Sequence, residues 1–327
     1  MDDWRRQLRF DPLPALVSST NKAIVYFAQH DLLDQWKVPR EYLWELPSAR
    51  KMIERQQKDG SWKYPGGKPS IRSSENYNQL ETYRVLGELI EKYGFTREHP
   101  SIGKAADFMF EFQTDDGDLR GIYGNQFSPN YTAAIMELLI KAGYESDSRI
   151  EKGFPWLLSV RQEDGGWAIP VRTVGGRESR CISQALNSPI TFQPDRSKPF
   201  SHCITGVVLR AFAAHPRYRE KEEAKNAGRL LKSRFFKADK YPDRKAASFW
   251  TSFSYPFWFT DLLSALDSLS LLGFPNRNEE VRTGLQWFID RQQDDGLWNL
   301  HLLRGKDKEL PLWIGLAICR VFRRFHT

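Results

Sequence analysis

Apolar residues along the chain follow two kinds of helical spacing. In the first kind they form a single stripe that ends at a polar turn, as in residues 105–112 and 154–160. In the second kind they cover most sides of the helix, as in residues 132–140, and this indicates burial all round. We therefore expect amphipathic outer helices that alternate with buried inner helices. The predicted inner helices are 77–93, 131–142, 202–214, 258–272 and 312–322.

Two further segments complete this alternation. A helix over 15–30 precedes the first inner helix. Residues 224–243 keep the helical spacing of an outer helix and end in a Tyr-Pro-Asp-Arg turn. Alternating apolar and polar residues, the pattern of a strand, form no convincing run. The pattern predicts an all-α protein of five or six outer and inner helix pairs.

A short phrase recurs where outer helices end. It consists of a basic or aromatic residue, a Gln, one or two polar residues, Asp-Gly and then an aromatic residue. Gln56, Gln113 and Gln162 lie 57 and 49 residues apart in three copies, and a fourth copy contains Gln292. Such a period marks one supersecondary unit that is used several times. The glycine supplies the positive φ that a helix end often needs. We expect the Gln and the aromatic residue to brace successive helices, with the amide stacked on the indole.

The full form of this phrase, Gln-x-x-Asp-Gly-x-Trp after a helix, resembles the repeat of the terpenoid-cyclase and protein-prenyltransferase superfamily. Squalene and hopene cyclases are the most similar in the form of the repeat, and the resemblance extends from about Tyr42 to Trp313. It implies a single α/α toroid domain over residues 1–327, with outer helices around inner ones and a central cavity. It also implies an isoprenoid or similar hydrophobic ligand, cyclized after protonation.

Asp261 is the candidate catalytic acid of such a cyclase. The family's acid motif, Asp-x-Asp-Asp, is absent, and Asp261 stands alone in the first turns of a predicted inner helix. A protonating carboxyl group has to stay neutral in a dry pocket. The alternative is that Asp261 only stabilises the start of its helix through the macrodipole. In that case the toroid has lost the cyclase acid and binds a ligand or a partner without chemistry.

Aromatic residues are the candidates for the wall of the cavity. Residues 249–261 contain seven aromatics, among them Tyr255, Phe257 and Trp258, and Trp313 begins the last inner helix. Aromatic faces stabilise carbocations and other cations. The alternative is that these rings pack the inner helices against one another.

Three more candidate ligand-binding residues stand at the starts of inner helices. Tyr77, Tyr131 and His202 either line the mouth of the cavity or cap their helices. His202 and Cys203 are unsuited to a shared metal ion, because adjacent residues on a helix point about 100° apart. We expect no metal and no cofactor.

The loops that follow the repeated phrase are basic. The longest, 168–201, carries Arg177, Arg180 and Arg196. In a toroid these loops share one rim with the N-termini of the inner helices, which favour anions. We expect this rim to bind a phosphate, diphosphate or carboxylate group of the ligand. The alternative is that the charges are scattered over solvated loops.

Composition narrows the range of partners and locations. The formal net charge of +7 over 327 residues is modest, and no segment resembles a nucleic-acid-binding module, so we expect no nucleic acid. The three cysteines do not form a disulfide framework. The N-terminus lacks the layout of a signal peptide, and no stretch is as long as a membrane span. We expect a cytoplasmic protein, with peripheral membrane contact left open.

Overall fold

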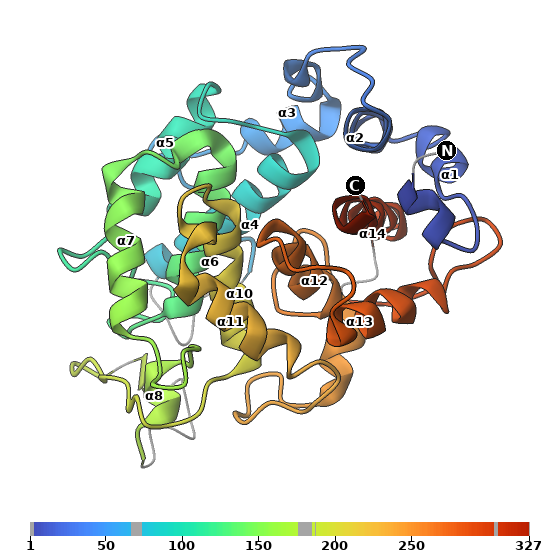
Figure 1. Cartoon of the computed structure of the whole chain (residues 1–327). Helices are drawn as coiled ribbons and strands as arrows, with labels where there is room; N and C mark the ends of the chain where they lie inside the picture. Colours follow the sequence, from blue (N-terminus) through green and yellow to red (C-terminus); the bar gives the residue numbers. More distant parts are fainter. Residues whose placement is uncertain (1–2, 67–73, 176–184, 187, 304–306, 327) are drawn as a thin grey trace.

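An inner layer of helices forms a closed ring. The computed structural model describes residues 3–66, 74–175, 185–186, 188–303 and 307–326. Each inner helix contacts the next, and the last one returns to the first; Figure 1 shows α14 between α12 and α2. The prediction of an all-α toroid is confirmed. The inner helices are α2 (Lys22–Leu33), α4 (Ser74–Tyr93), α6 (Pro129–Leu139), α10 (His202–Ala214), α12 (Leu262–Leu271) and α14 (Leu310–His326).

Outer helices cover this ring, each packed on an inner helix next to it in the sequence. They are α1 (Leu13–Val17), α3 (Pro47–Ile53), α5 (Pro100–Phe110), α7 (Ser148–Ser159), α11 (Glu222–Lys232) and α13 (Glu279–Ile289). Shorter elements join the layers: η1 (Asp3–Gln7), η2 (Arg40–Leu43), the π-turn η3 (Ile140–Tyr144), α8 (Pro170–Thr173), η4 (Tyr218–Glu220), η5 (Ala247–Thr251), and the parallel pair β1 (Ser252–Phe253) and β2 (His301–Leu302). Helix α11 confirms the outer helix predicted in 224–243.

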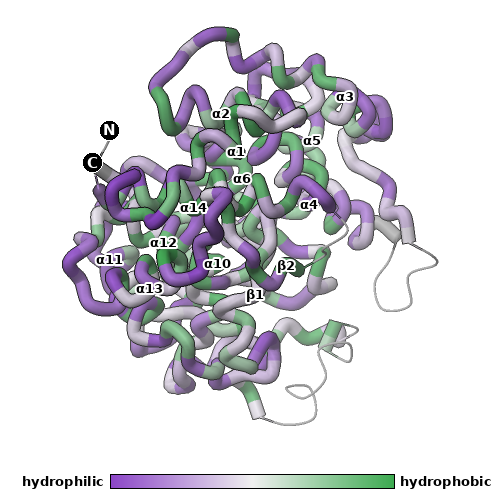
Figure 2. The backbone as a smooth tube through the Cα atoms, turned by 90° about the vertical axis from the view of Figure 1, so that its right-hand side faces the viewer, coloured by the Kyte–Doolittle hydropathy of each residue, from purple (hydrophilic) through white to green (hydrophobic). Residues whose placement is uncertain are grey.

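The hydrophobic core lies between the two layers. Figure 2 shows apolar residues gathered in the middle of the molecule and polar residues at its edge. The largest fully buried side chains include Trp4, Trp167, Trp250 and Trp313. Among the described residues, no helix has the length and apolar character needed to cross a membrane.

The glutamines of the repeated phrase tie one outer helix to the next. The Gln56 side-chain amide donates to the carbonyl of Ser101 in the first turn of α5, at 2.8 Å. Gln113 makes the same bond to Arg149 in α7, also at 2.8 Å. Gln162 donates to the carbonyls of Asp195 and Lys198 in the loop before α10. The glutamines thus brace successive units, as predicted, through hydrogen bonds to backbone carbonyls. The expected stacking of the amide on the indole stays a prediction.

The aromatic end of the phrase is tied to its own helix and to the inner layer. The indole nitrogens of Trp62, Trp167 and Trp298 each donate to the carbonyl ten residues earlier, at 2.7–2.9 Å. The backbone N–H of Trp62 donates to the Thr82 hydroxyl on α4, and that of Trp167 to a threonine on α10. The phrase therefore fixes an outer helix to both of its neighbours.

The last copy of the phrase closes the ring. The Gln292 side-chain oxygen accepts from the backbone N–H groups of Arg9 and Phe10 at 2.9 and 3.0 Å. Its amide donates to the carbonyls of Phe10 and Gly296 at 2.8 and 2.9 Å. Helix α13 is thereby bound to the segment before α1, 282 residues away in sequence.

The two main differences between predicted and observed helix boundaries lie between α1 and α2 and at the start of α12. The helix expected over 15–30 is interrupted, because Asn21 caps a new helix by accepting from the N–H groups of Ala23 and Ile24. The inner helix expected from Trp258 begins only at Leu262, because Asp261 adopts an extended conformation and caps it. The residues before Asp261 therefore lie outside this helix.

Candidate functional site

Residues 254–261 run through the centre of the ring; we call them the central segment. At one end, the Thr260 hydroxyl donates to the carbonyl of Cys203, near the start of α10. At the other, the Tyr255 hydroxyl donates to the backbone carbonyl of Glu91, near the end of α4, at 3.3 Å. Starts and ends of inner helices lie on opposite rims of the toroid. The central segment therefore spans the lumen from rim to rim.

Trp258 of the central segment crosses the lumen to α4. Its ring lies where a Cβ atom on Gly87 would sit, with the two only 2.5 Å apart, so glycine at position 87 gives the ring its space. The same ring meets Tyr83 edge to face, with centroids 5.3 Å apart. Trp258 and its neighbours divide the lumen into two cavities, one toward each rim.

The first cavity, which we call the aromatic pocket, lies toward the starts of the inner helices and has a volume of about 250 Å³. Its wall includes Tyr83, Tyr123, Tyr131, Trp258, Phe259 and Arg244. The rings of Tyr123 and Tyr83 both meet Tyr131 edge to face, at 5.0 and 6.0 Å. The Arg244 guanidinium lies 3.2 Å from the centroid of Phe259, so a cation already covers that face. The pocket is mainly apolar, with one guanidinium in its wall.

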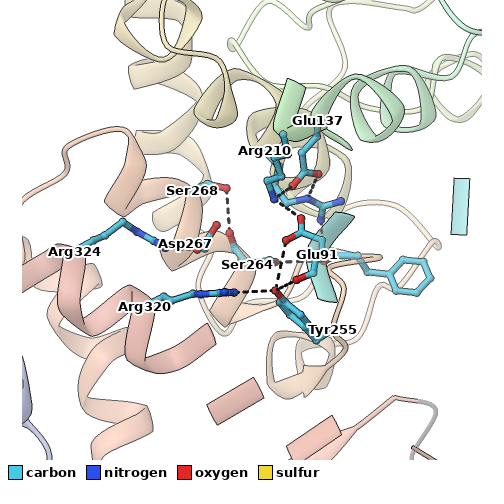
Figure 3. A network of polar contacts seen from close by, with 11 residues as sticks. Glu91, Glu137, Arg210, Tyr255, Ser264, Asp267, Ser268, Arg320 and Arg324 are labelled. Atoms are coloured by element: carbon cyan, nitrogen blue, oxygen red, sulfur yellow. Dashed lines mark hydrogen bonds and ion pairs between the residues drawn. The ribbon is translucent and has the colours of Figure 1, made fainter. Parts of the chain in front are cut away.

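The second cavity, which we call the polar pocket, lies toward the ends of the inner helices and has a volume of about 360 Å³. Its wall includes Glu91, Lys141, Tyr255, Asp267, Arg320 and Arg324. Figure 3 shows the Tyr255 hydroxyl between Arg320, which donates to it at 3.0 Å, and Glu91. Arg324 pairs with Asp267, and Arg320 pairs with Asp31. Most charges of this pocket are thus satisfied within the protein.

A buried charge cluster lies between the two pockets. Arg210, with its side chain 2% exposed, is 2.7 Å from Glu137, and Lys141 lies 2.8 Å from Glu137 and 2.5 Å from Glu91. Burial alone would raise the pKa of Glu137, but the charges of Arg210 and Lys141 hold it below its usual value. Arg210 also donates to the carbonyl of Phe259 at 3.2 Å. The cluster therefore fastens the central segment to α6 and α10.

Asp261 is buried at the end of the central segment, with 1% of its surface exposed. Its carboxylate accepts from the backbone N–H of Ser264 at 2.8 Å, and the Ser264 hydroxyl accepts from the N–H of Asp261 at 3.0 Å. Burial raises the pKa of Asp261 to about 7, although the bonds to Ser264 and the charge of Arg210 act the other way. The described linings of the two pockets do not include Asp261. Asp261 is therefore the N-cap of α12 in the described structure.

The aromatic candidates divide between the two pockets. Tyr131 and Trp258 line the aromatic pocket, whereas Tyr255 and Phe257 line the polar pocket. Trp313 is 1% exposed and stacks on Tyr255, with centroids 5.7 Å apart and an interplanar angle of 9°. Trp313 therefore supports a wall residue from behind.

Two candidates at helix starts lie apart from both pockets. Tyr77 packs on Tyr64 at 4.8 Å. His202 is buried, stacks on Trp250 at 4.7 Å and lies 3.3 Å from Asp239. Burial lowers the pKa of His202 to about 4, and it raises the pKa of the neighbouring Cys203 thiol to about 12. Both groups are therefore uncharged near neutral pH.

In their described parts, the basic loops do not present a row of free cations to the aromatic pocket. Arg196 donates to the backbone carbonyl of Arg161 at 2.7 Å, on the outer side of the ring. Arg172 forms a bidentate pair with Asp243, at 2.7 and 2.8 Å. Arg177 and Arg180 lie outside the described residues. Arg244 is therefore the described cation that lines the aromatic pocket, and the anion-binding rim stays a prediction.

Several residues of the site were not predicted from the sequence. Tyr83, Tyr123 and Arg244 line the aromatic pocket, and Arg210 and Glu137 hold the central segment. An arginine and a glutamate inside the apolar patterns of α10 and α6 were the only available clue, because buried charges are nearly always paired.

No protein-family model matches the sequence. A search of curated proteins by sequence found no match. Solved structures similar to this chain include the apo form of type II terpene cyclase MstE from Scytonema, with 11% identity, a TM-score of 0.35 and coverage of 90% of this chain and 98% of that chain. They also include a structure described as a novel alpha-amylase from Clostridium perfringens, with 13% identity, a TM-score of 0.43 and coverage of 99% and 86%. A third is a protein from Actinoplanes, with 13% identity, a TM-score of 0.38 and coverage of 88% of each chain.

The raised pKa of Asp261 predicts how stability depends on pH. In the folded protein Asp261 titrates near 7, whereas an unfolded aspartate titrates near 4. Between these values the folded state keeps a proton that the unfolded state has lost, so stability falls as the pH rises through this window and is level above it. The Asp261→Asn variant keeps a good helix cap and loses this dependence. We expect its stability advantage over the parent to grow by about 1 kcal/mol per pH unit from pH 4 to pH 7.

Thermal unfolding of both proteins at pH 5, 6, 7 and 8 measures this difference. The Ser264→Ala variant, which loses half of the capping box but keeps the carboxyl group, serves as the control. Its stability should still fall as the pH rises, with the upper end of the window moved up, because a bond that lowers the pKa of Asp261 is lost. Parallel curves for the parent and the asparagine variant would show that Asp261 titrates at its ordinary pKa in the fold.

Proposed function

We propose that this protein binds an isoprenoid or similarly apolar small molecule in the aromatic pocket. The observation that carries the proposal is the wall of that pocket, where three tyrosines, a tryptophan and a phenylalanine surround about 250 Å³. Ligand sites are typically concave, mostly apolar and furnished with a few polar groups. The volume is close to the lower end for ligand pockets, about 300 Å³, and this favours compact ligands over squalene.

Binding without chemistry accounts for this arrangement best. Asp243, which lines the aromatic pocket, is held by Arg172, and Asp261 caps α12 and is not among the described lining residues. A pocket with aromatic walls and no free acid among its described lining residues offers contact area and shape, which are the main sources of affinity for an apolar ligand.

Filling each cavity in turn tests this proposal. Ala134 lines the aromatic pocket and Ala214 lines the polar pocket, so Ala134→Leu and Ala214→Leu place the same extra volume in opposite cavities. Calorimetric titration with geraniol, farnesol, geranylgeraniol and their diphosphates should find a ligand for the parent. We expect Ala134→Leu to weaken it about tenfold or more, since three lost ligand methylene contacts are worth about 2 kcal/mol, and Ala214→Leu to leave it unchanged. Equal effects of the two variants, or binding lost only with Ala214→Leu, would reject the aromatic pocket as the site.

A second candidate function is cyclization of the bound isoprenoid, as in a class II terpene cyclase, with Asp261 as the acid. It is favoured by one observation, the burial that raises the pKa of Asp261 to about 7 and keeps much of it protonated near neutral pH. Incubation with squalene and the linear prenyl diphosphates, followed by mass spectrometry, separates the two functions. Cyclic products that vanish with Asp261→Asn would establish the enzyme, whereas binding without any product would leave the binding function alone.

A further inference from the structure

Tyr83 places an unused hydroxyl group in the wall of the aromatic pocket. Its ring is fixed edge to face against Trp258 and Tyr131, and only 5% of the residue is exposed. No group in the described part of the chain forms a hydrogen bond with this hydroxyl. An occupant of the pocket that supplies an acceptor oxygen can form this hydrogen bond, which is typically worth about 0.5–1.5 kcal/mol.

Arg210 leaves a second donor unused beside Tyr83. Its Nε is bound to Glu137 and its Nη1 to the carbonyl of Phe259, but its buried Nη2 has no partner. Arg210 is the charged group with the largest influence on Tyr83: burial raises the pKa of Tyr83, and the nearby guanidinium opposes this. Arg210 is not among the described lining residues of the aromatic pocket, so its charge acts on Tyr83 from behind the wall.

The charges around these donors decide what kind of acceptor fits. Arg210 and Lys141 contribute two positive charges, and Glu137 and Glu91 contribute two negative charges. A full negative charge at the Tyr83 end of the pocket would lie beside this balanced cluster, because Arg244, which also lines the pocket, is not among the groups with the largest influence on Tyr83. Burying an uncompensated charge is costly. A neutral oxygen satisfies the Tyr83 hydroxyl without that cost.

We propose that the occupant of the aromatic pocket is an apolar molecule with a neutral acceptor oxygen, such as a ketone, aldehyde or ester carbonyl, at the end that reaches Tyr83. This inference rests on the proposed function and adds the polar end of the ligand. Tyr83 is a specificity-determining residue in it: the tyrosine hydroxyl donates to the ligand oxygen, and Arg210 strengthens the bond electrostatically from behind.

Camphor and camphane test this assignment, because they are compact isoprenoids of the same shape that differ by one carbonyl oxygen. Tyr83→Phe removes the hydroxyl and keeps the ring. We expect it to weaken camphor about tenfold and to change camphane less than twofold, measured by calorimetry or by displacement of a fluorescent apolar probe. Tyr144→Phe makes the same change at a buried tyrosine of η3 that is absent from the lining of the aromatic pocket, and it should alter neither ligand.

The outcomes separate this inference from the function beneath it. If the parent binds camphane and Tyr83→Phe weakens both ligands equally or neither, the pocket is apolar throughout and the assignment of Tyr83 is wrong. If neither ligand binds the parent, the proposed binding function fails, and the inference fails with it. A selective loss of camphor affinity that Tyr144→Phe does not reproduce supports the assignment.

Discussion

Replacing Gln292 with leucine is expected to lower the free energy of unfolding by about 3 kcal/mol, because it removes four hydrogen bonds to backbone groups, each worth about 1 kcal/mol. These are the N–H groups of Arg9 and Phe10 and the carbonyls of Phe10 and Gly296. Gln56 and Gln113 tie neighbouring outer helices, whereas Gln292 joins the two ends of the ring. The loss should therefore also free the N-terminal segment, which urea unfolding and limited trypsin digestion at Arg5, Arg6 and Arg9 together detect.

Gln293 supplies the matched control on the same helix end. Its side chain is exposed and has no hydrogen bond among the described residues, so Gln293→Ala should change stability by less than about 0.5 kcal/mol. Equal stability losses for Gln292→Leu and Gln293→Ala, or unchanged trypsin sensitivity of the N-terminal segment, would mean that the ring is not held closed at this point.

Replacing Arg210 with methionine is expected to cost about 3–5 kcal/mol, the usual effect of removing one partner of a buried ion pair. The change removes one of the two cations that pair with Glu137. It also removes the hydrogen bond to the carbonyl of Phe259 in the central segment. Chemical unfolding measures the loss. Because the segment lines both pockets, ligand affinity should fall together with stability.

The double variant Arg210→Met, Glu137→Leu distinguishes an unpaired charge from lost packing. Lys141 keeps Glu91 as a partner in this variant, so no charge of the cluster is left alone. We expect the double variant to be more stable than Arg210→Met by about 1–2 kcal/mol. Strictly additive losses would show that Arg210 acts through packing and not through its charge.

The sequence predicts the ring of helices well because the repeated phrase is a local feature. A turn after each outer helix and a Gln beside it are properties of eight neighbouring residues, and the same short geometry recurs at each copy. The closure through Gln292 was beyond such reasoning, because its partners at residues 9 and 10 belong to no copy of the phrase. The interruption after α1 is a weak signal as well, since one asparagine cap decides it.

The sequence predicted which aromatic residues lie at the cavity, but not how they are arranged around it. The aromatic block was expected at the cavity, and Tyr255, Phe257 and Trp258 do lie there, but they face two different cavities. That division depends on the late start of α12 and on the space at Gly87, which only the folded chain brings opposite Trp258. The Arg210–Glu137 pair spans 73 residues and two helices, so no spacing in the sequence reports it.

The central segment gives the two cavities a common wall. Tyr255 and Phe257 face one cavity, and Trp258 and Phe259 face the other, within five consecutive residues. A ligand in one cavity that shifts this wall changes the ligand affinity of the other cavity. Thermodynamic linkage makes the effect equal in both directions. Two ligands with no contact between them can in this way cooperate or compete across a single stretch of backbone.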